Sequence, residues 1–440
     1  MNKVYILTGA AGLLGSNISR LLVERGETVR ALVLEGDPAI RCIPEGIEII
    51  PGDLLNQESL ETLFDVPEDS EVYVIHSASV ITLRPDPNPK VYAVNVGGTK
   101  NIIEMCLKHK VKKLVYISST SAIPELPHGQ KIKEVDHFLP TDGLVGYYAV
   151  TKAEASQAVL DAVRKHPEFD ASIVHPSGIC GPNDYAFGPV AQLITQYMGG
   201  DMKIGLEGTF NSVDVRDLAA GVVACCKKGR RGECYIMGNE LVTMKELYEL
   251  INDAADLDIH AAILSKGIAN AVVKLLKFQS KFTGNEPLLT DFGLYNLTRN
   301  NDYDCTKAET ELGFTCRPFA ETIRDEVLWL KEEAANAPEI NEEVKKTAAA
   351  ISERVKLGDI DRIIVYSDDE PLYTMPVKAS IAAGIGGILF APYAMIPAAM
   401  IAFGSNVQVE LESHDGRRFD IKGNLIPKAG KTVGAIKDKR

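Results

Sequence analysis

The feature that most constrains this 440-residue chain is a glycine-rich turn after its first apolar run. Val4–Leu7 is typical of a strand and Leu13–Val23 has helical spacing, so Thr8-Gly9-Ala10-Ala11-Gly12-Leu13-Leu14-Gly15 joins a strand to a helix. Glycines allow a backbone to approach a pyrophosphate, and a helix N-terminus offers unpaired N–H groups. A phosphate-binding turn is predicted, the alternative being a tight connection without a ligand. The candidate residues are Gly9, Ala11, Gly12, Leu13, Leu14 and Gly15.

Apolar strands and amphipathic helices continue to alternate beyond this turn. Further strands are predicted at Thr28–Leu34, Ile47–Ile50, Glu71–Ile75, Lys113–Ser118 and Ala171–His175. Long helices are predicted at Val91–His109 and Tyr148–Arg164. The pattern is that of an α/β fold with a doubly wound, Rossmann-type parallel sheet. It loosens over residues 178–330, which we interpret as a smaller substrate-binding region within a domain spanning 1–335.

Two acidic residues are candidates for binding the rest of a dinucleotide. Glu35 follows the second strand, 20 residues after Gly15, where an acid commonly binds the ribose 2′-OH. Because no Arg stands at Leu34 to take a 2′-phosphate, NAD is favoured over NADP. Asp53, before Leu54, follows the third strand and is interpreted either as an acceptor for the adenine amino group or as the N-cap of the next helix.

A tyrosine and a lysine are spaced for proton transfer. Tyr148 and Lys152 are four residues apart on a predicted helix and so share one face. An unperturbed phenol is a poor base at pH 7, and we expect the ammonium group to lower the pKa of Tyr148. The pair is then suited to exchange a proton with a substrate oxygen while hydride moves to or from a nicotinamide. A solvated helix face is the alternative.

These motifs together resemble the extended short-chain dehydrogenase/reductase superfamily, over about residues 1–335. The resemblance rests on the glycine turn, Gly52-Asp53-Leu54, His76-Ser77-Ala78-Ser79, Asn95-Val96-Gly97-Gly98-Thr99, the serine-rich end of the fifth strand and Tyr148 with Lys152. It implies that Tyr148 is the catalytic acid/base, that Lys152 holds the nicotinamide ribose, and that Thr120 is the third catalytic residue, with Ser119 as the alternative. Asn95 is a support residue or a packing amide.

One segment separates branches of this superfamily. His175-Pro176-Ser177-Gly178-Ile179-Cys180-Gly181-Pro182 resembles the R-P-S-x-I-x-G-P segment of the 3β-hydroxysteroid dehydrogenase and dihydroflavonol reductase branch, whereas sugar-nucleotide epimerases carry Asn where Ser177 stands. His175 departs from the usual Arg. The resemblance further implies that Ser77, Ala78, Pro176 and Ser177 contact the coenzyme, and that Asp217 supports the fold.

Composition excludes several other classes. With 47 Lys and Arg against 60 Asp and Glu, the net charge of −13 argues against nucleic-acid binding. The eight cysteines contain no C-x-x-C pair, so reduced thiols are expected and a metal site is not. The N-terminus becomes polar within eight residues, too early for a signal peptide, so a cytoplasmic location is expected.

The last hundred residues are a separate piece of sequence. Residues 336–350 are predicted to be a linker helix, and 351–440 a small α+β domain with a hairpin at Arg362–Ser367 and Leu372–Val377 and a strand at Gln408–Ser413. Ala379–Val409 carries no charge over 31 residues. Pro392 divides it into pieces too short to span a bilayer, which favours a buried or oligomerising segment over a membrane-embedded hairpin or a span. This tail resembles a bacterial domain of unknown function.

The sequence therefore predicts an NAD(P)-dependent oxidoreductase that interconverts a secondary alcohol with a ketone or aldehyde on a fairly apolar small molecule. Two alternatives stay open: a sugar-nucleotide epimerase or dehydratase with tightly held NAD, and a non-catalytic dinucleotide sensor. The expected partners are a small-molecule substrate and, by analogy with related enzymes, a second copy of the chain.

Overall fold

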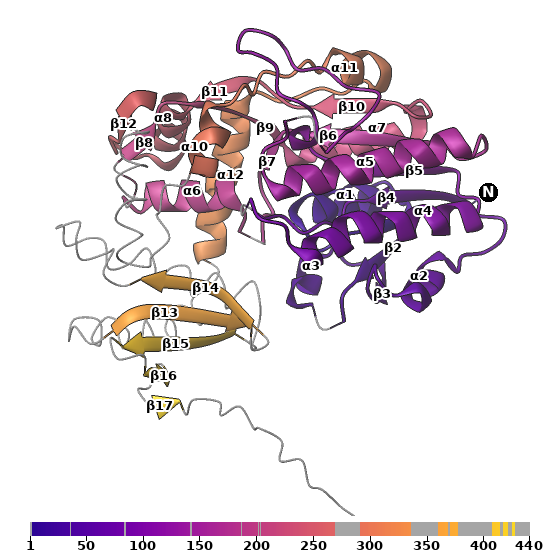
Figure 1. Ribbon diagram of the computed structural model, residues 1–440, viewed down its shortest axis with the longest axis horizontal. Coiled ribbons are helices and arrows are strands. Elements are labelled where there is room, and N and C mark those ends of the chain that lie inside the picture. The colour runs from indigo at the N-terminus through magenta and orange to yellow at the C-terminus, as the bar shows by residue number, and fades with distance from the viewer. Residues whose placement is uncertain are drawn as a thin grey trace, which may run out of the picture. The chain divides into compact units, whose positions relative to one another are not determined.

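The computed structural model describes most of the first 335 residues and parts of the remainder (Figure 1). The described residues are 2–35, 37–82, 85–140, 143–185, 187–200, 202, 204–268, 291–335, 360–367, 370–376, 407–413, 417–420 and 425–426. The chain divides into two compact units, Met1–Glu333 and Ala334–Arg440.

A seven-stranded parallel sheet forms the centre of the first unit, with strand order β10-β6-β5-β4-β1-β2-β3. Its strands are β1 (Lys3–Thr8), β2 (Thr28–Val33), β3 (Glu48–Pro51), β4 (Glu71–His76), β5 (Lys113–Ile117), β6 (Ala171–Pro176) and β10 (Cys234–Met237). The predicted strands are confirmed, because near-continuous apolar runs suit strands that are buried on both faces. The strand order reverses between β1 and β4, and open α/β sheets bind ligands at the carboxyl ends of such strands.

Two hydrophobic cores cover the two faces of this sheet. One core packs α2 (Gln57–Phe64), α4 (Thr99–Lys108) and α5 (Tyr147–Lys165) against the strands. The other packs α1 (Leu13–Glu24), α7 (Val215–Lys228) and α11 (Thr306–Leu312) on the opposite face. Figure 1 shows α4 and α5 lying side by side across the sheet. The Rossmann-type arrangement is therefore confirmed.

The helix expected at Val91–His109 is built differently from a single α-helix. It consists of the short α3 (Pro89–Tyr92), a π-helical segment η2 (Ala93–Gly98) and α4. A π-helical turn carries an extra residue per hydrogen-bonded ring and is often found at functional positions. This segment contains Asn95, whose side chain forms two hydrogen bonds with the backbone of Val80. The Asn95 Oδ1 accepts from the Val80 N–H at 2.7 Å, and the Asn95 Nδ2 donates to the Val80 carbonyl at 3.0 Å.

The loosely patterned region forms a smaller layer with its own core. Three helices supply most of that core, namely α6 (Pro189–Met198), α8 (Met244–Ala255) and α12 (Phe319–Ala335). Its strands are β7 (Gly178–Cys180), β9 (Thr209–Asp214) and β11 (Leu241–Thr243) in one sheet, with β8 (Ile204–Leu206) and β12 (Ala262–Leu264) in another. The remaining described helical elements are η1 (Pro38–Cys42), η3 (Thr120–Ala122) and α10 (Asp291–Thr298).

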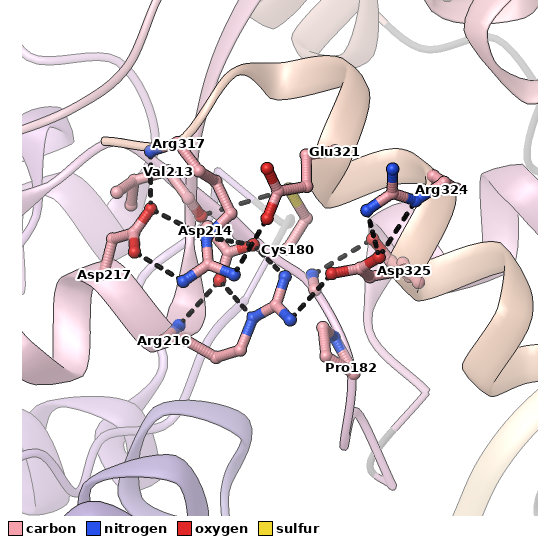
Figure 2. A network of polar contacts seen from close by, with 12 residues as sticks. Cys180, Pro182, Val213, Asp214, Arg216, Asp217, Arg317, Glu321, Arg324 and Asp325 are labelled. Atoms are coloured by element: carbon pink, nitrogen blue, oxygen red, sulfur yellow. Dashed lines mark hydrogen bonds and ion pairs between the residues drawn. The ribbon is translucent and has the colours of Figure 1, made fainter.

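A charged network joins this layer to the sheet domain (Figure 2). Asp214 is fully buried and pairs with Arg216 at 2.7 Å and with Arg317 at 3.3 Å. Arg216 also forms an ion pair with Asp325 on α12 at 2.8 Å. The guanidinium group of Arg317 donates two hydrogen bonds to the carboxylate of Asp217, at 2.7 and 3.0 Å. Asp217 therefore holds the segment before α12 onto α7, in agreement with its expected support of the fold.

The second unit contains a five-stranded antiparallel sheet, in the order β14-β13-β15-β16-β17. Its strands are β13 (Ile360–Ser367), β14 (Glu370–Pro376), β15 (Val407–Ser413), β16 (Arg418–Asp420) and β17 (Leu425–Ile426). The hairpin and the later strand are confirmed. The expected linker helix at 336–350, and all of the apolar segment 379–409 except its last three residues, lie outside the described residues. Among the helices that are described, none is both long and apolar enough to cross a bilayer.

Candidate active site

The glycine turn leaves open space at the N-terminus of α1. Gly9 has φ +75°, and a Cβ there would lie 2.7 Å from the backbone N of Ala78. A Cβ on Gly15 would collide with the Gly9 carbonyl, so these two glycines are required by the turn itself. Gly12 differs, because it is exposed, no side chain caps the helix there, and a Cβ would meet only the Gly9 oxygen at 3.5 Å. This uncapped helix end fits a pyrophosphate.

The other nucleotide-binding candidates are distributed around that turn. Ser77 and Ala78 follow β4, directly beside Gly9. Glu35 is exposed two residues after β2. Leu14 and Leu54 are buried in the two cores with 6% exposure each, so their backbones alone remain to contact a coenzyme, while Ala11 and Leu13 are partly exposed at the start of α1.

The N-cap interpretation of Asp53 is wrong. The N-cap of α2 is Asn56, whose Oδ1 accepts from the N–H groups of Glu58 and Ser59 at 2.8 and 3.1 Å. Asp53 is exposed and accepts from Leu55 N at 2.9 Å, which forms a turn before the helix. Of the two interpretations of Asp53, only contact with a nucleotide stays a prediction.

Tyr148 and Lys152 lie on one face of α5, as their spacing predicts. The Lys152 Nζ lies 5.9 Å from the centre of the Tyr148 ring and 5.1 Å from that of Tyr116. Lys152 is 2% exposed, and its ammonium donates to the carbonyl of Ile117, the last residue of β5, at 2.8 Å. The pair is thus held at the carboxyl end of β5, the strand that neighbours β4 in the sheet.

The expectation that Lys152 lowers the pKa of Tyr148 is wrong. Burial raises the pKa of Tyr148 to about 12, and hydrogen bonds with Ser79 and Ser119 only partly offset that increase. Burial also lowers the pKa of Lys152 to about 7. Desolvation disfavours the charged form of each group and is the largest cause of both pKa shifts. At neutral pH the phenol of Tyr148 therefore keeps its proton and is suited to donate it.

Two hydroxyl groups stand beside the phenol. Hydrogen bonds link Tyr148 with Ser119, at the end of β5, and with Ser79, after β4. Ser119 is the alternative to Thr120 that the sequence left open, and Thr120 begins η3 one residue later, 5% exposed. The sequence analysis missed Ser79 as a site residue, although its position just past a strand end in the His76-Ser77-Ala78-Ser79 motif was a usable signal.

A buried hydrogen-bonded chain connects the glycine turn with α5. Thr8 Oγ1 lies 2.7 Å from His76 Nδ1, and His76 Nε2 lies 3.0 Å from Thr99 Oγ1, whose proton goes to the Asn95 carbonyl at 2.7 Å. The Asn95 side chain donates to Thr151 Oγ1 at 3.1 Å, and Thr151 donates to the Tyr148 carbonyl at 2.8 Å. Asn95 is thus a support residue rather than a simple packing amide.

The remaining two candidates end β6. Pro176 is the last residue of that strand, and Ser177 follows it with 7% exposure. Ser177 N donates to the Met237 carbonyl at 3.1 Å, which extends the pairing of β6 with β10. Within the described ranges, no group of three or more His, Cys, Asp or Glu side chains is arranged to hold a metal ion.

Comparison with known proteins places this geometry in a family. Residues 5–238 match the NAD dependent epimerase/dehydratase family. The chain belongs to that family. The expected extended short-chain dehydrogenase/reductase resemblance is thereby confirmed, and the chain is an NAD(P)-dependent oxidoreductase of the epimerase/dehydratase type. Residues 335–413 match a domain of unknown function, DUF4342.

Individual relatives are distant but cover the same part of the chain. A putative dihydroflavonol 4-reductase of Synechocystis is 27% identical over 75% of this chain and 95% of its own length. The sterol-4-alpha-carboxylate 3-dehydrogenase (decarboxylating) of Saccharomyces cerevisiae is 29% identical over 66% of this chain and 84% of its own. The crystal structure of gox2253 superposes with a TM-score of 0.66 and 28% identity, covering 76% of this chain and 99% of that chain.

Proposed function

We propose that this family member interconverts a secondary alcohol with a ketone or aldehyde on a fairly apolar small molecule. The observation that carries the proposal is the cluster of Tyr148, Lys152 and Ser119 at the carboxyl end of the sheet, beside the uncapped start of α1. A nicotinamide dinucleotide, when bound, supplies the hydride acceptor or donor. The glycine turn would hold its pyrophosphate, and Glu35 its adenosine ribose, which favours NAD.

The side chains of this cluster have separate tasks. Ser119 donates a hydrogen bond to the reacting oxygen of the substrate, with Thr120 the neighbouring alternative. Tyr148, whose pKa burial raises to about 12, donates its proton to that oxygen during reduction. In the oxidation direction Tyr148 must first lose its proton to solvent, and the phenolate then accepts the proton of the alcohol. Lys152 binds a ribose hydroxyl, while its contact with the Ile117 carbonyl fixes the ammonium at this position.

Two observations support an alcohol or ketone substrate over a nucleotide sugar. Ser177 stands where sugar-nucleotide epimerases carry Asn. The named relatives include a dihydroflavonol reductase and a sterol 3-dehydrogenase, whose names describe redox changes at a ring carbon. An apolar ring system with one secondary hydroxyl or keto group is therefore the substrate class to test first.

The proposal is tested by following coenzyme absorbance with a panel of sterols, flavanones and simple alicyclic alcohols and ketones, each with NAD and NADP. We expect turnover of at least one alicyclic compound, preferentially with NAD, and a loss of roughly 100- to 10,000-fold in kcat for Tyr148→Phe. Tyr92→Phe, on α3, is the matched control. Full turnover by Tyr148→Phe would remove Tyr148 from the chemistry, and stabilisation by UDP-sugars without redox turnover would favour an epimerase.

A further inference from the structure

His175, where the resembling branch usually carries Arg, contacts the backbone of Ser119 in the catalytic cluster. It is the fifth residue of β6, is fully buried, and its Nδ1 lies 2.9 Å from the carbonyl oxygen of Ser119 at the end of neighbouring β5. The ring of Phe138 stacks on the imidazole, with centroids 5.2 Å apart and 25° between the planes. The ring therefore has a fixed plane and a fixed hydrogen-bond direction.

The protonation state of this ring follows from its partners. A carbonyl oxygen can only accept, so Nδ1 must carry the hydrogen. Nε2 is buried and has no hydrogen-bond partner, so a proton there would be an unsatisfied donor in an apolar site. Burial lowers the pKa of His175 to about 4, and the positive charges of Lys152 and Lys307 act in the same direction. His175 is thus a neutral Nδ1–H donor.

The carbonyl that His175 holds belongs to the residue that faces Tyr148. Ser119 is extended, with φ −162° and ψ 151°, and its Oγ accepts from Ser121 N at 3.1 Å while its side chain also bonds with Tyr148. A rotation of the peptide after Ser119 would move the Ser121 N–H, and the Ser119 hydroxyl would lose the donor that orients it beside the phenol. The hydrogen bond from His175 to the Ser119 carbonyl opposes that rotation.

We propose that His175 is a positioning residue of the active site, which, as a neutral Nδ1–H donor, holds the Ser119 peptide so that the Ser119 hydroxyl stays aligned with Tyr148. This inference rests on the proposed function of Ser119 and Tyr148. It gives a chemical task to the residue that departs from the branch pattern, since a neutral imidazole makes the contact without adding a second cation beside Lys152.

A pair of isosteric substitutions tests the position of the donor. The side-chain amide of Asn reaches about as far as Nδ1 of His, whereas that of Gln reaches to about Nε2. We expect His175→Gln to lower kcat on the order of 10- to 100-fold, with the KM for NAD within about twofold of wild type. His175→Asn should recover most of the loss. Equal losses in both variants, at equal thermal stability, would contradict the proposal.

A measurement that needs no substrate decides the protonation state. In histidine-labelled full-length protein, two-bond ¹H–¹⁵N spectra assigned by comparison with His175→Asn should show the Nδ1–H form of His175 and no titration from pH 5 to pH 9. An Nε2–H form, or titration near pH 6.5, overturns the inference. If no compound in the panel turns over while the spectra are as expected, the proposed function has failed and the donor assignment stands.

Discussion

At the scale of single residues, the site contains a lysine that is almost fully buried. Lys152 is 2% exposed and keeps one backbone acceptor, and burial lowers its pKa from 10.5 to about 7. In the unfolded chain the same amine stays protonated up to pH 10.5. Between these two values the unfolded state binds more protons than the native state, so the stability of the native state increases with pH.

Replacing Lys152 with Met removes this proton linkage. We expect the free energy of unfolding of Lys152→Met, relative to wild type, to decline as the pH rises from 7 toward 9.5, by up to about 1.4 kcal/mol per pH unit. Urea unfolding followed by the fluorescence of Trp329, the sole tryptophan, measures this difference. A difference that is constant over this range would mean that the pKa of Lys152 is close to its ordinary value.

At the scale of secondary-structure elements, the β1–α1 connection separates two kinds of glycine. Gly9 is needed because its φ is +75° and a Cβ would lie against the backbone of Ala78. Gly12 has φ −80° and ψ 168°, which any residue adopts, and its missing Cβ opens space only toward the exterior. Gly9 is therefore required by the fold, whereas we propose that position 12 is a glycine because a bound pyrophosphate needs the space that a side chain would fill.

Alanine substitutions distinguish these two requirements. We expect Gly12→Ala to change the free energy of unfolding by less than about 1 kcal/mol, yet to weaken binding of NADH roughly tenfold or more, because the methyl group fills the pyrophosphate position. Gly9→Ala should instead destabilise the fold by about 1–3 kcal/mol. Fluorescence titration with NADH and urea unfolding measure the two effects. Unchanged NADH affinity in Gly12→Ala would favour a tight connection without a ligand.

The elements also show where sequence reasoning succeeds and where it stops. Strands β1 to β6 were predictable because burial on both faces leaves an uninterrupted apolar run, and the Tyr148–Lys152 spacing placed both side chains on one helix face. The π-helical segment was not predictable, and neither was the contact of its Asn95 with Val80, 15 residues away. Nor was the raised pKa of Tyr148, which depends on burial by distant residues. The N-cap of α2 was assigned to Asp53 as one of two interpretations, and this was wrong because Asn56, three residues later, is an equally good N-cap.

At the scale of the whole molecule, the chain consists of two units with different architectures. The first has its own hydrophobic cores on both faces of a parallel sheet, and the second has a separate antiparallel sheet. We propose that residues 1–335 form an independently folding oxidoreductase domain and that residues 351–440 form another domain.

A chain that ends at residue 335 tests this division. We expect it to bind NADH with the affinity of the full-length protein, within about threefold, and to unfold with a similar midpoint because the cores of the first unit are complete. Titration of NADH and thermal unfolding of both proteins give the comparison. Aggregation of the shortened chain, or loss of NADH binding, would show that the first unit depends on residues 336–440.

The place of β10 at one edge of the parallel sheet has a consequence for biosynthesis. Residues 234–237 pair with β6, whose strand ends at residue 176, so a nascent chain must extend about 60 residues further before that pairing can form. During this interval the backbone of β6 presents unpaired N–H and C=O groups along that edge. Misassembly with a neighbouring nascent chain should therefore be easiest between the emergence of β6 and that of β10.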